Sequence, residues 1–229
     1  MKKKTIEIYP TQKQVSQIDA TIKACQEVRN YFIDIYRECY NAEHPISFPS
    51  KNELRKILTY IRNNKPISNM EFEAKGKNSV PKELRLDAKA YNTAIKEAIK
   101  RAEKNFYLKD STKISDSESF SKLLKQSSRN ALETTVNHLI SEYVRFVTRN
   151  KKGSLKAGAY SHPRYKYDKR EFAIDRLNAV KAKSGKLFIP QIRYIDLSEP
   201  FAEEVEIKKC EIKKRKRKYY ATLEYKPKE

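Results

Sequence analysis

Apolar side chains recur along most of this sequence at the 3.6-residue spacing of amphipathic helices. The longest such pattern runs from Phe120 to Val147, and it predicts one long helix. Val15–Cys39, Asn52–Arg62 and Ser79–Phe106 show the same spacing. The pattern therefore predicts a bundle of about four helices over the first two thirds of the chain.

Capping and breaking residues set the expected ends of these helices. Thr11 followed by Gln14 matches a capping box, and Pro81 suits the first turn of the helix that begins at Ser79. Asn63–Ser79 has no apolar period and is predicted to be a loop. Lys109–Glu118 is predicted to be a polar linker.

Strand-like patterns occur at the start of the chain and after residue 151. Lys2–Tyr9 alternates apolar and polar residues, and Phe172–Ile174 and Leu187–Pro190 are short apolar runs. Val205–Lys213 and Tyr219–Lys226 predict a β-hairpin with a strongly basic tip. The first strand has no local partner, so we expect it to pair with these late strands.

This pairing predicts an α+β fold in which the helices are inserted into a small antiparallel β-barrel. The expected segments are 1–10 for the first strand, 11–150 for the helices and 151–229 for the rest of the barrel.

The charge of the chain indicates the class of its partner. The 50 Lys+Arg against 29 Asp+Glu give a formal net charge of +21. A charge of this size opposes compaction and indicates an anionic partner. We expect nucleic acid rather than a membrane, because no apolar run approaches the length of a span and the N-terminus does not resemble a signal peptide.

The cysteines and histidines predict no metal centre. Cys25, Cys39 and Cys210 are scattered, form no CxxC pair and suit a reducing cytoplasm as small core residues. The chain has three histidines, and no group of residues has metal-ligand spacing. We therefore expect a cytoplasmic protein without a metal ion or cofactor.

Six stretches of the sequence carry a resemblance to a known family. In order they are EIYPTQKQ, CQEVRNYFIDIYRECY, NALETTVNHLISEYVRFV, HPRYK, SGKLFIP and IKKCEIKKRKRKYYATLEYK. In this order they resemble the transposon-encoded TnpB (OrfB-type) proteins and the related compact type V CRISPR effectors. The resemblance covers most of the chain apart from residues 63–118, and it implies a helical REC-like bundle inserted into a WED-like (OB-like) barrel.

The sequence also departs from that family. The family continues from its last hairpin into a RuvC-like nuclease, which opens with a G-[IV]-D-x-G strand, and it carries a CxxC…CxxC zinc ribbon. This sequence contains neither. Cleavage by that nuclease fold needs clustered carboxylates that hold two Mg²⁺ ions. The resemblance therefore implies recognition modules without the RuvC and zinc-ribbon domains, in a protein that is not an enzyme.

The resemblance implies RNA-guided, sequence-specific binding of double-stranded DNA without cleavage, next to a short adjacent motif. Occupancy of the site would repress transcription in the bacterial cytoplasm, at the nucleoid. The expected partners are a guide RNA and the target DNA, and the number of protein copies per RNA stays open. Two alternatives stand beside this hypothesis: a module that binds only guide RNA, and the recognition half of a split nuclease.

The resemblance and the residue chemistry together suggest RNA contacts, because guanidinium groups and aromatic rings suit phosphates and unpaired bases. The alternative to an RNA contact is, for each residue, a solvated surface charge. For the basic hairpin tip as a whole, the alternative is a solubilising turn. The residues are Arg29, Asn30, Arg164, Tyr165, Lys166, Lys169, Arg170, Arg176, Lys213, Lys214, Arg215, Lys216, Arg217 and Lys218.

A second set matches the positions that read the DNA motif, where Arg and Asn can pair with purine edges. Glu133 is equally compatible with an ordinary exposed helix position. The residues of this set are Phe48, Ser50, Asn52, Arg129, Asn130 and Glu133. Five aromatic residues are assigned to the core instead: Tyr9, Phe32, Tyr36, Tyr143 and Phe146. His162 stands where the family commonly has glycine, which alters the expected path of that loop.

Overall fold

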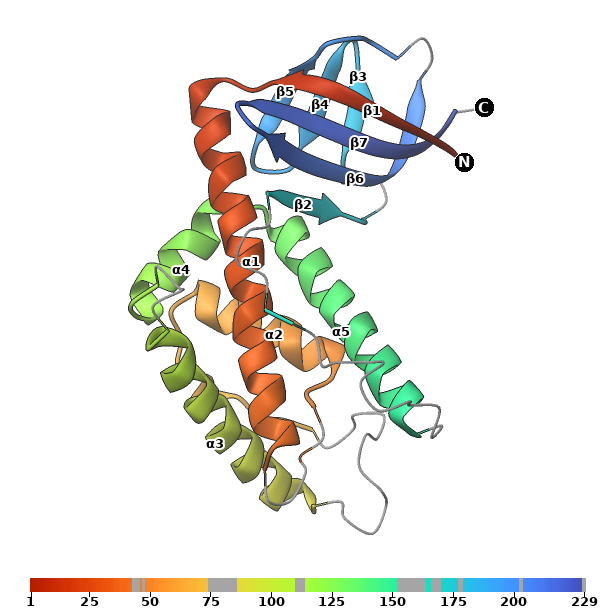
Figure 1. The fold of residues 1–229 in the computed structure, drawn as a ribbon. Coiled ribbons are helices and arrows are strands. Elements are labelled where there is room, and N and C mark those ends of the chain that lie inside the picture. Colours follow the sequence, from red (N-terminus) through yellow and green to blue (C-terminus); the bar gives the residue numbers. More distant parts are fainter. Residues whose placement is uncertain are drawn as a thin grey trace. The chain divides into compact units, whose positions relative to one another are not determined.

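The computed structural model describes residues 1–42, 46, 48–73, 86–109, 114–151, 164–165, 170–176, 179–201 and 204–227. Over these residues the fold is mixed α+β, as predicted (Figure 1). The helices are α1 (Gln12–Tyr40), α2 (Lys51–Arg62), η1 (Ile67–Asn69, a 3-10 turn), α3 (Ala88–Tyr107), α4 (Ser117–Gln126) and α5 (Arg129–Lys151). The strands are β1 (Lys2–Tyr9), β2 (Glu171–Ile174), β3 (Lys181–Lys183), β4 (Lys186–Ile189), β5 (Arg193–Leu197), β6 (Val205–Arg215) and β7 (Lys218–Pro227).

The chain forms two compact units, each built from separate stretches of sequence. The sheet unit comprises Met1–Gln26, Leu123–Thr135 and Asp168–Glu229, and the helical unit comprises Glu27–Lys122 and Val136–Tyr167. Helices α1, α4 and α5 each contribute residues to both units. The segments 1–10, 11–150 and 151–229 expected from the sequence followed the change from helix to strand, whereas the boundaries of the compact units fall within three helices.

The sheet unit contains one antiparallel sheet in the order β2-β6-β7-β1-β5-β4-β3. Strand β1 lies between β7 and β5, with Ile6 opposite Ala221 and Ile8 opposite Leu197. The prediction that the first strand pairs with the late strands is therefore confirmed. Strands β6 and β7 form the predicted hairpin.

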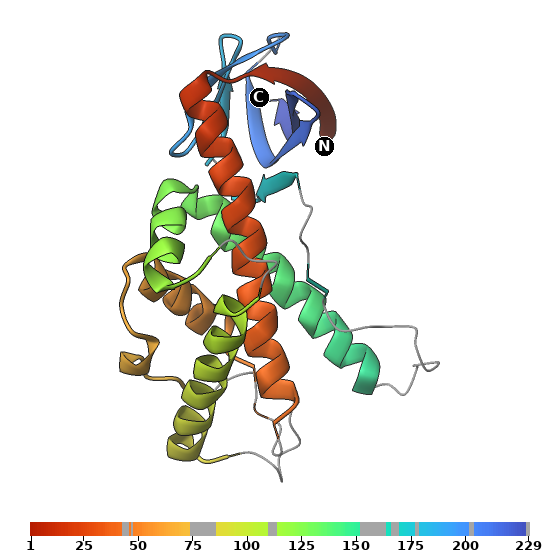
Figure 2. The same cartoon turned by 60° about the vertical axis from the view of Figure 1, so that its left-hand side comes forward.

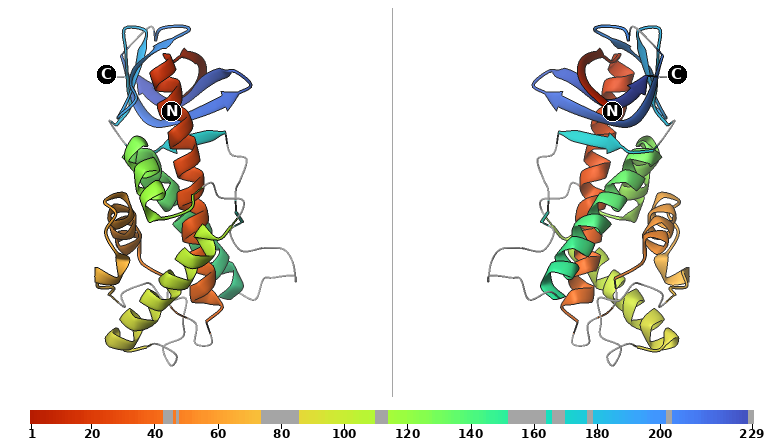
Figure 3. Two further views of the ribbon diagram at one scale, coloured as in Figure 1. Left: turned by 90° about the vertical axis from the view of Figure 1, so that its left-hand side faces the viewer. Right: turned by 90° about the vertical axis from the view of Figure 1, so that its right-hand side faces the viewer.

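The sheet is open rather than closed into a barrel. The strands at its two ends are β2, with four residues, and β3, with three. Within the described residues, β2 and β3 are not connected to each other by hydrogen bonds that would close the sheet. The sheet curls, as Figures 2 and 3 show, and Cα atoms of β3 come within 8 Å of Cα atoms of β6. The structure thus has a curled sheet with two edges where the sequence predicted a closed barrel.

One face of the sheet is apolar because alternate residues of each strand point to it. These side chains are almost fully buried and form the core of the sheet unit. They include Ile6, Ile8, Phe172, Ile174, Leu187, Ile189, Ile195, Cys210, Ile212, Ala221 and Leu223.

Helix α1 lies between α3 and α5 in the helical unit (Figures 1 and 2). Tyr31 of α1 packs edge-on against Phe106 of α3, with ring centroids 5.3 Å apart. Tyr36, one turn and a half further on, packs against Tyr143 of α5 at 4.0 Å. Aromatic side chains thus fill both sides of α1.

The core assignment is wrong for one of the five aromatic residues. Phe32, Tyr36 and Phe146 are buried, and Tyr143 is half-buried against Tyr36. Tyr9, however, is 54% exposed. It follows the buried Ile8, so strand alternation turns its ring to the opposite face.

The long helix predicted over Phe120–Val147 is two helices, α4 and α5, separated at Ser127–Ser128. The Ser127 hydroxyl donates to the carbonyls of Leu123 (2.7 Å) and Ala20 (3.2 Å). The Ser128 amide donates to the Thr21 hydroxyl at 3.2 Å. Short polar side chains compete with helical hydrogen bonds in this way. Contacts with α1 therefore hold the break that apolar periodicity alone did not reveal.

Local capping explains the other boundaries. The Thr11 amide donates to Gln14 Oε1 at 2.9 Å, and the Gln14 amide approaches Thr11 Oγ1 at 3.4 Å, which confirms the predicted capping box. Helix α3 begins at Ala88 behind the cap residue Asp87 rather than at Ser79. Residues 79–85 of that prediction lie outside the described residues.

Candidate nucleic-acid interface

The tip of the β6–β7 hairpin presents three exposed cations, Arg215, Lys216 and Arg217, which we call the hairpin tip. Arg215 is opposite Lys218, so the turn between the strands has only two residues, and Lys216 adopts a positive φ of 55°. The Arg215 guanidinium lies 5.7 Å from the centre of the Tyr220 ring. Neither Lys216 nor Arg217 has a side-chain hydrogen bond or ion pair within the described residues.

Unlike Lys216 and Arg217, the lysines that flank the hairpin tip form ion pairs with carboxylates. Side-chain hydrogen bonds to these carboxylates raise the pKa of all three lysines, so each stays charged near neutral pH. The pairs are Lys213 with Glu171 of β2 (3.1 Å), Lys214 with Asp19 of α1 (2.6 Å) and Lys218 with Glu7 of β1 (3.1 Å).

These pairs fix the base of the hairpin. Asp19 also accepts a hydrogen bond from the Tyr219 hydroxyl at 3.1 Å, and the Lys214 amide donates to the Arg170 carbonyl at 2.8 Å. The exposed Arg170 is thereby placed beside β6. The matched lysines tie the hairpin to its neighbours, and the three tip cations remain open to an anionic ligand such as phosphate.

The start of α5 brings four predicted residues together. Arg129 Nε donates to Glu133 at 2.9 Å, and Arg176 Nη1 donates to Asn130 Oδ1 at 3.4 Å. Arg176 was predicted to contact RNA and the other three to contact DNA, so both predicted sets meet here. Arg129 and Arg176 are exposed.

The turn before β5 was missed by the sequence analysis. Gln191 and Arg193 have positive φ angles of 71° and 73°, which are unusual for residues other than glycine. Gln14 holds this turn by donating to the carbonyls of Ile192 (3.2 Å) and Tyr194 (2.7 Å). The backbone amide of Arg129 donates to Gln191 Oε1 at 2.8 Å, so the turn lies against the start of α5. Pro190, directly before Gln191, is a sequence signal that could have indicated this turn, in which the Ile192 amide donates to the Ile189 carbonyl at 3.1 Å.

Arg29 and Asn30 are buried in the helical unit, with 5% and 1% exposure. The Arg29 guanidinium donates to both oxygens of Glu142, at 2.6 and 3.1 Å, and to the Arg164 carbonyl at 3.3 Å. The structure therefore places Arg29 in an internal ion pair of α1 with α5.

Tyr165 is anchored to α1 through the buried Asp34. Its hydroxyl donates to Asp34, and Lys109 Nζ donates to Asp34 Oδ2 (2.6 Å) and to the Tyr165 hydroxyl oxygen (2.9 Å). The Arg37 guanidinium and the Lys109 ammonium lie 4.2 and 4.1 Å from the centre of the Tyr165 ring. Burial, and then the hydrogen bond to Asp34, raise the pKa of Tyr165, so the phenol is neutral.

The predicted DNA residues near α2 take structural roles or lie at the surface. Phe48 is 7% exposed and packs against Tyr36, with ring centroids 5.2 Å apart. The Ser50 side chain caps α2 in a capping box with Glu53, while Asn52 is exposed. Lys166 and Lys169 of the predicted RNA set, and His162 before them, lie outside the described residues.

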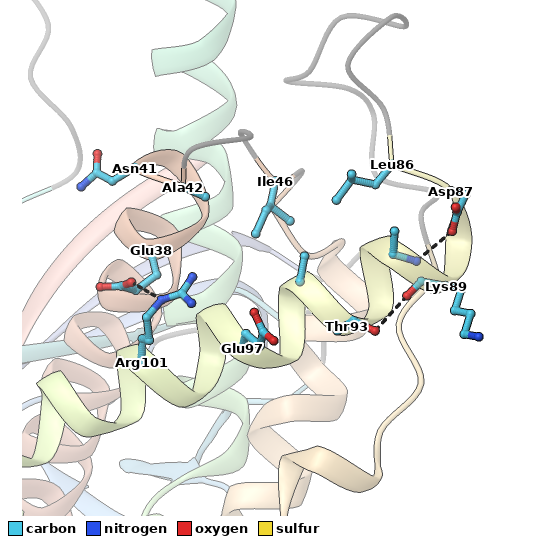
Figure 4. Close-up of a pocket in the computed structure, with 12 residues that line it drawn as sticks. Glu38, Asn41, Ala42, Ile46, Leu86, Asp87, Lys89, Thr93, Glu97 and Arg101 are labelled. Carbon is cyan, nitrogen blue, oxygen red and sulfur yellow. Dashed lines mark hydrogen bonds and ion pairs between the residues drawn. The ribbon is translucent and has the colours of Figure 1, made fainter.

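The described part of the helical unit has two surface cavities. The larger, of about 820 Å³, is formed by α1, α3 and the apolar Ile46 and Leu86 (Figure 4). The Arg101–Glu38 ion pair (3.0 Å) lies at one end of it. The second, of about 720 Å³, lies between α3 and the segment around η1. None of the residues predicted to contact nucleic acid lines either cavity.

Searches for a metal site, a membrane span and known relatives give no further assignment. Among the described residues, no group of three or more His, Cys, Asp or Glu can hold a metal ion. No described helix is long and apolar enough to cross a membrane. No model of a known protein family matches the chain, and no curated protein sequence matches it. The resemblance to the TnpB family therefore rests on the sequence motifs alone.

Proposed function

We propose that this protein binds a structured RNA through the sheet unit. The observation that carries the proposal is the hairpin tip, where three exposed cations project from a hairpin whose flanking lysines, Lys213, Lys214 and Lys218, are held by carboxylates. Fixed cations of this kind suit a phosphate backbone because they bind it without first breaking internal ion pairs.

We further propose that the RNA acts as a guide and brings the protein to duplex DNA, where occupancy without cleavage represses transcription. The order of the six sequence motifs supports this step, as does the insertion of the helices between β1 and β2. In this proposal the curled sheet is the WED-like part and the helical unit is the REC-like part. Arg129, Asn130 and Arg176 are the candidates for contact with the adjacent DNA motif.

One observation favours the alternative of a module that binds only RNA. Phe48 is buried between Tyr36 and Tyr143, and Ser50 caps α2, so two of the six residues assigned to DNA have structural roles. In that case the protein would sequester guide RNA and bind no DNA through it.

A guide-swap experiment separates these two functions. The protein is assembled with the RNA that co-purifies with it, and the segment of that RNA that matches the genome is replaced. Binding to duplex DNA that matches the new segment, with no binding to the original target, is the result that we predict. Tight RNA binding without any guide-dependent DNA binding would overturn the guided function and support the RNA-only module.

The absence of cleavage is tested in the same assembly. Addition of Mg²⁺ is expected to leave the bound DNA intact, because the sequence lacks the carboxylate-bearing strand of the nuclease. Cutting by a preparation that mass spectrometry shows to be free of other nucleases would contradict this expectation.

A further inference from the structure

The outer face of the sheet differs between its two halves. Leu187 and Ile189 of β4 and Ile195 of β5 are fully buried. The residues that alternate with them along these strands therefore point to the opposite, outer face. On that face the strand register sets two neighbouring rows of side chains. One row is Lys181, Phe188 and Tyr194, and the other is Lys183, Lys186, Asp196 and Tyr9.

These rows combine aromatic rings with lysines. Tyr194 is 58% exposed and Tyr9 is 54% exposed, and the Phe188 and Tyr194 rings lie 5.1 Å apart. Lys181, Lys183 and Lys186 are exposed on the same face. The acidic member, Asp196, is 3.4 Å from Lys186 in an ion pair between two exposed side chains, which contributes little stability. We call these seven residues the aromatic platform.

The other half of the outer face is built from matched charges. Along β6, β7 and β1, Lys213 is paired with Glu171 (3.1 Å), and Lys3 with Glu224 (3.9 Å). Tyr220, the aromatic residue on this half, is opposite both Lys213 and Glu7 and is half-buried. The exposed rings of the outer face, Tyr194 and Tyr9, therefore lie on β5 and at the adjoining end of β1, next to the lysines of β3 and β4.

We infer that the aromatic platform binds a single-stranded nucleic acid, an inference that rests on the proposed function and names a second site for its ligand. Bases would stack on Tyr194 and Phe188, since every base has a flat face that an exposed ring can cover. Lys181, Lys183 and Lys186 would lie near the phosphates on either side. Sheets that present aromatic rings between basic residues bind unpaired RNA in this way. Two neighbouring rings fit about two successive bases.

The chain contains no tryptophan, which allows a direct test. Y194W introduces a single fluorescent ring on the platform, and T5W introduces one at an exposed position of the same face, opposite Thr222 and outside both the platform and the hairpin tip, as the control. Each variant is titrated with an unlabelled twelve-nucleotide RNA and a DNA strand of the same sequence. Overall affinity is measured separately by the polarisation of a labelled strand. Circular dichroism checks that each variant is folded.

We expect the fluorescence of Y194W to fall on binding while that of T5W changes little, and Y194A to weaken binding about tenfold. Quenching by the RNA strand, the DNA strand or both supports the platform and identifies the strand it takes. Binding without quenching of Y194W, together with unchanged affinity of Y194A, would overturn the platform and leave RNA binding elsewhere intact. Failure of every variant and of the wild type to bind either strand would also overturn the platform, while the proposed binding of a structured RNA is tested separately by the guide-swap experiment.

Discussion

The Arg29 guanidinium donates two hydrogen bonds to the Glu142 carboxylate, and the two residues differ in their access to water. Arg29 is 5% exposed, whereas the Glu142 side chain is 39% exposed. Loss of Glu142 would leave a buried cation with fewer partners, while loss of Arg29 would leave a carboxylate that water can reach. Because Arg29 is the more deeply buried of the two residues, removal of Glu142 should destabilise the protein more than removal of Arg29.

We predict that E142A lowers the free energy of unfolding by about 2 kcal/mol, which is less than for a fully buried pair because Glu142 is partly solvated. R29M, which keeps the volume of the side chain, should cost less. Urea unfolding of both variants measures the difference. A larger loss in R29M would contradict this account. RNA affinity retained in folded R29M would show that Arg29 supports packing rather than RNA contact.

Thr21 is predicted to hold the break between α4 and α5. It is fully buried and accepts the hydrogen bond of the Ser128 amide at 3.2 Å. T21V keeps the shape but leaves that amide without its partner, so it should cost about 1–3 kcal/mol of stability. T135V is the matched control, because Thr135 also donates to the carbonyl four residues before it but, among the described residues, accepts no hydrogen bond from another helix. Equal losses in the two variants, measured by urea unfolding, would contradict the role of Thr21.

The stability of the helical unit should depend on pH through Glu103. Burial raises the pKa of this carboxyl above its ordinary value, and the hydrogen bond from Tyr31 (3.1 Å) acts in the opposite direction. The folded state thus holds the proton more tightly than the unfolded state. The contribution of Glu103 to stability is therefore largest below the ordinary glutamate pKa of about 4.3 and is lost as the pH rises through the raised folded value.

The E103Q variant isolates this effect. The unfolding free energy of the wild type minus that of E103Q should fall with rising pH across that window. In a Y31F background the fall should be larger, because the hydrogen bond that favours the ionised form is gone. A difference that rises with pH, or that does not change, would contradict the assignment.

Removal of the hairpin-tip cations should weaken RNA binding without loss of stability. The double variant K216S/R217S is expected to reduce the slope of log affinity against log salt by about 0.7 for each lost phosphate contact. K2S/K226S removes the same charge from the far ends of β1 and β7 and serves as the control. Binding titrations at several salt concentrations measure both slopes. The same reduction in both variants would mean that net charge alone drives the binding.

The sequence predicted the elements whose signals are local. The hairpin of β6 and β7 and the capped start of α1 follow from alternation and from Thr11 with Gln14. The pairing of β1 with late strands followed because the strand had no neighbour along the chain. The open edge of the sheet was not predictable, because closure depends on how short end strands pair in space.

Features of the structure that depend on tertiary contacts were predicted less well. The α4–α5 break needs Thr21 and Ala20 from a distant helix, and periodicity across Ser127 gave no sign of it. Strand β5 and the turn at Gln191 were missed although Pro190 precedes the turn, because the contacts of Gln14 and Arg129 that hold it come from distant helices. Phe48 and Arg29 are residue types that often occur in binding sites. In the structure both are buried, and Arg29 is ion-paired with Glu142.

The central claim, that the protein binds a specific structured RNA, is tested most directly by sequencing the RNA that co-purifies with it. The protein is purified from its native host at moderate salt, and the bound RNA is recovered and sequenced. We predict one discrete RNA with a constant scaffold and a segment that matches a genomic site. A mixture of cellular RNAs that salt removes would contradict the claim and would mean that the +21 charge alone causes the association.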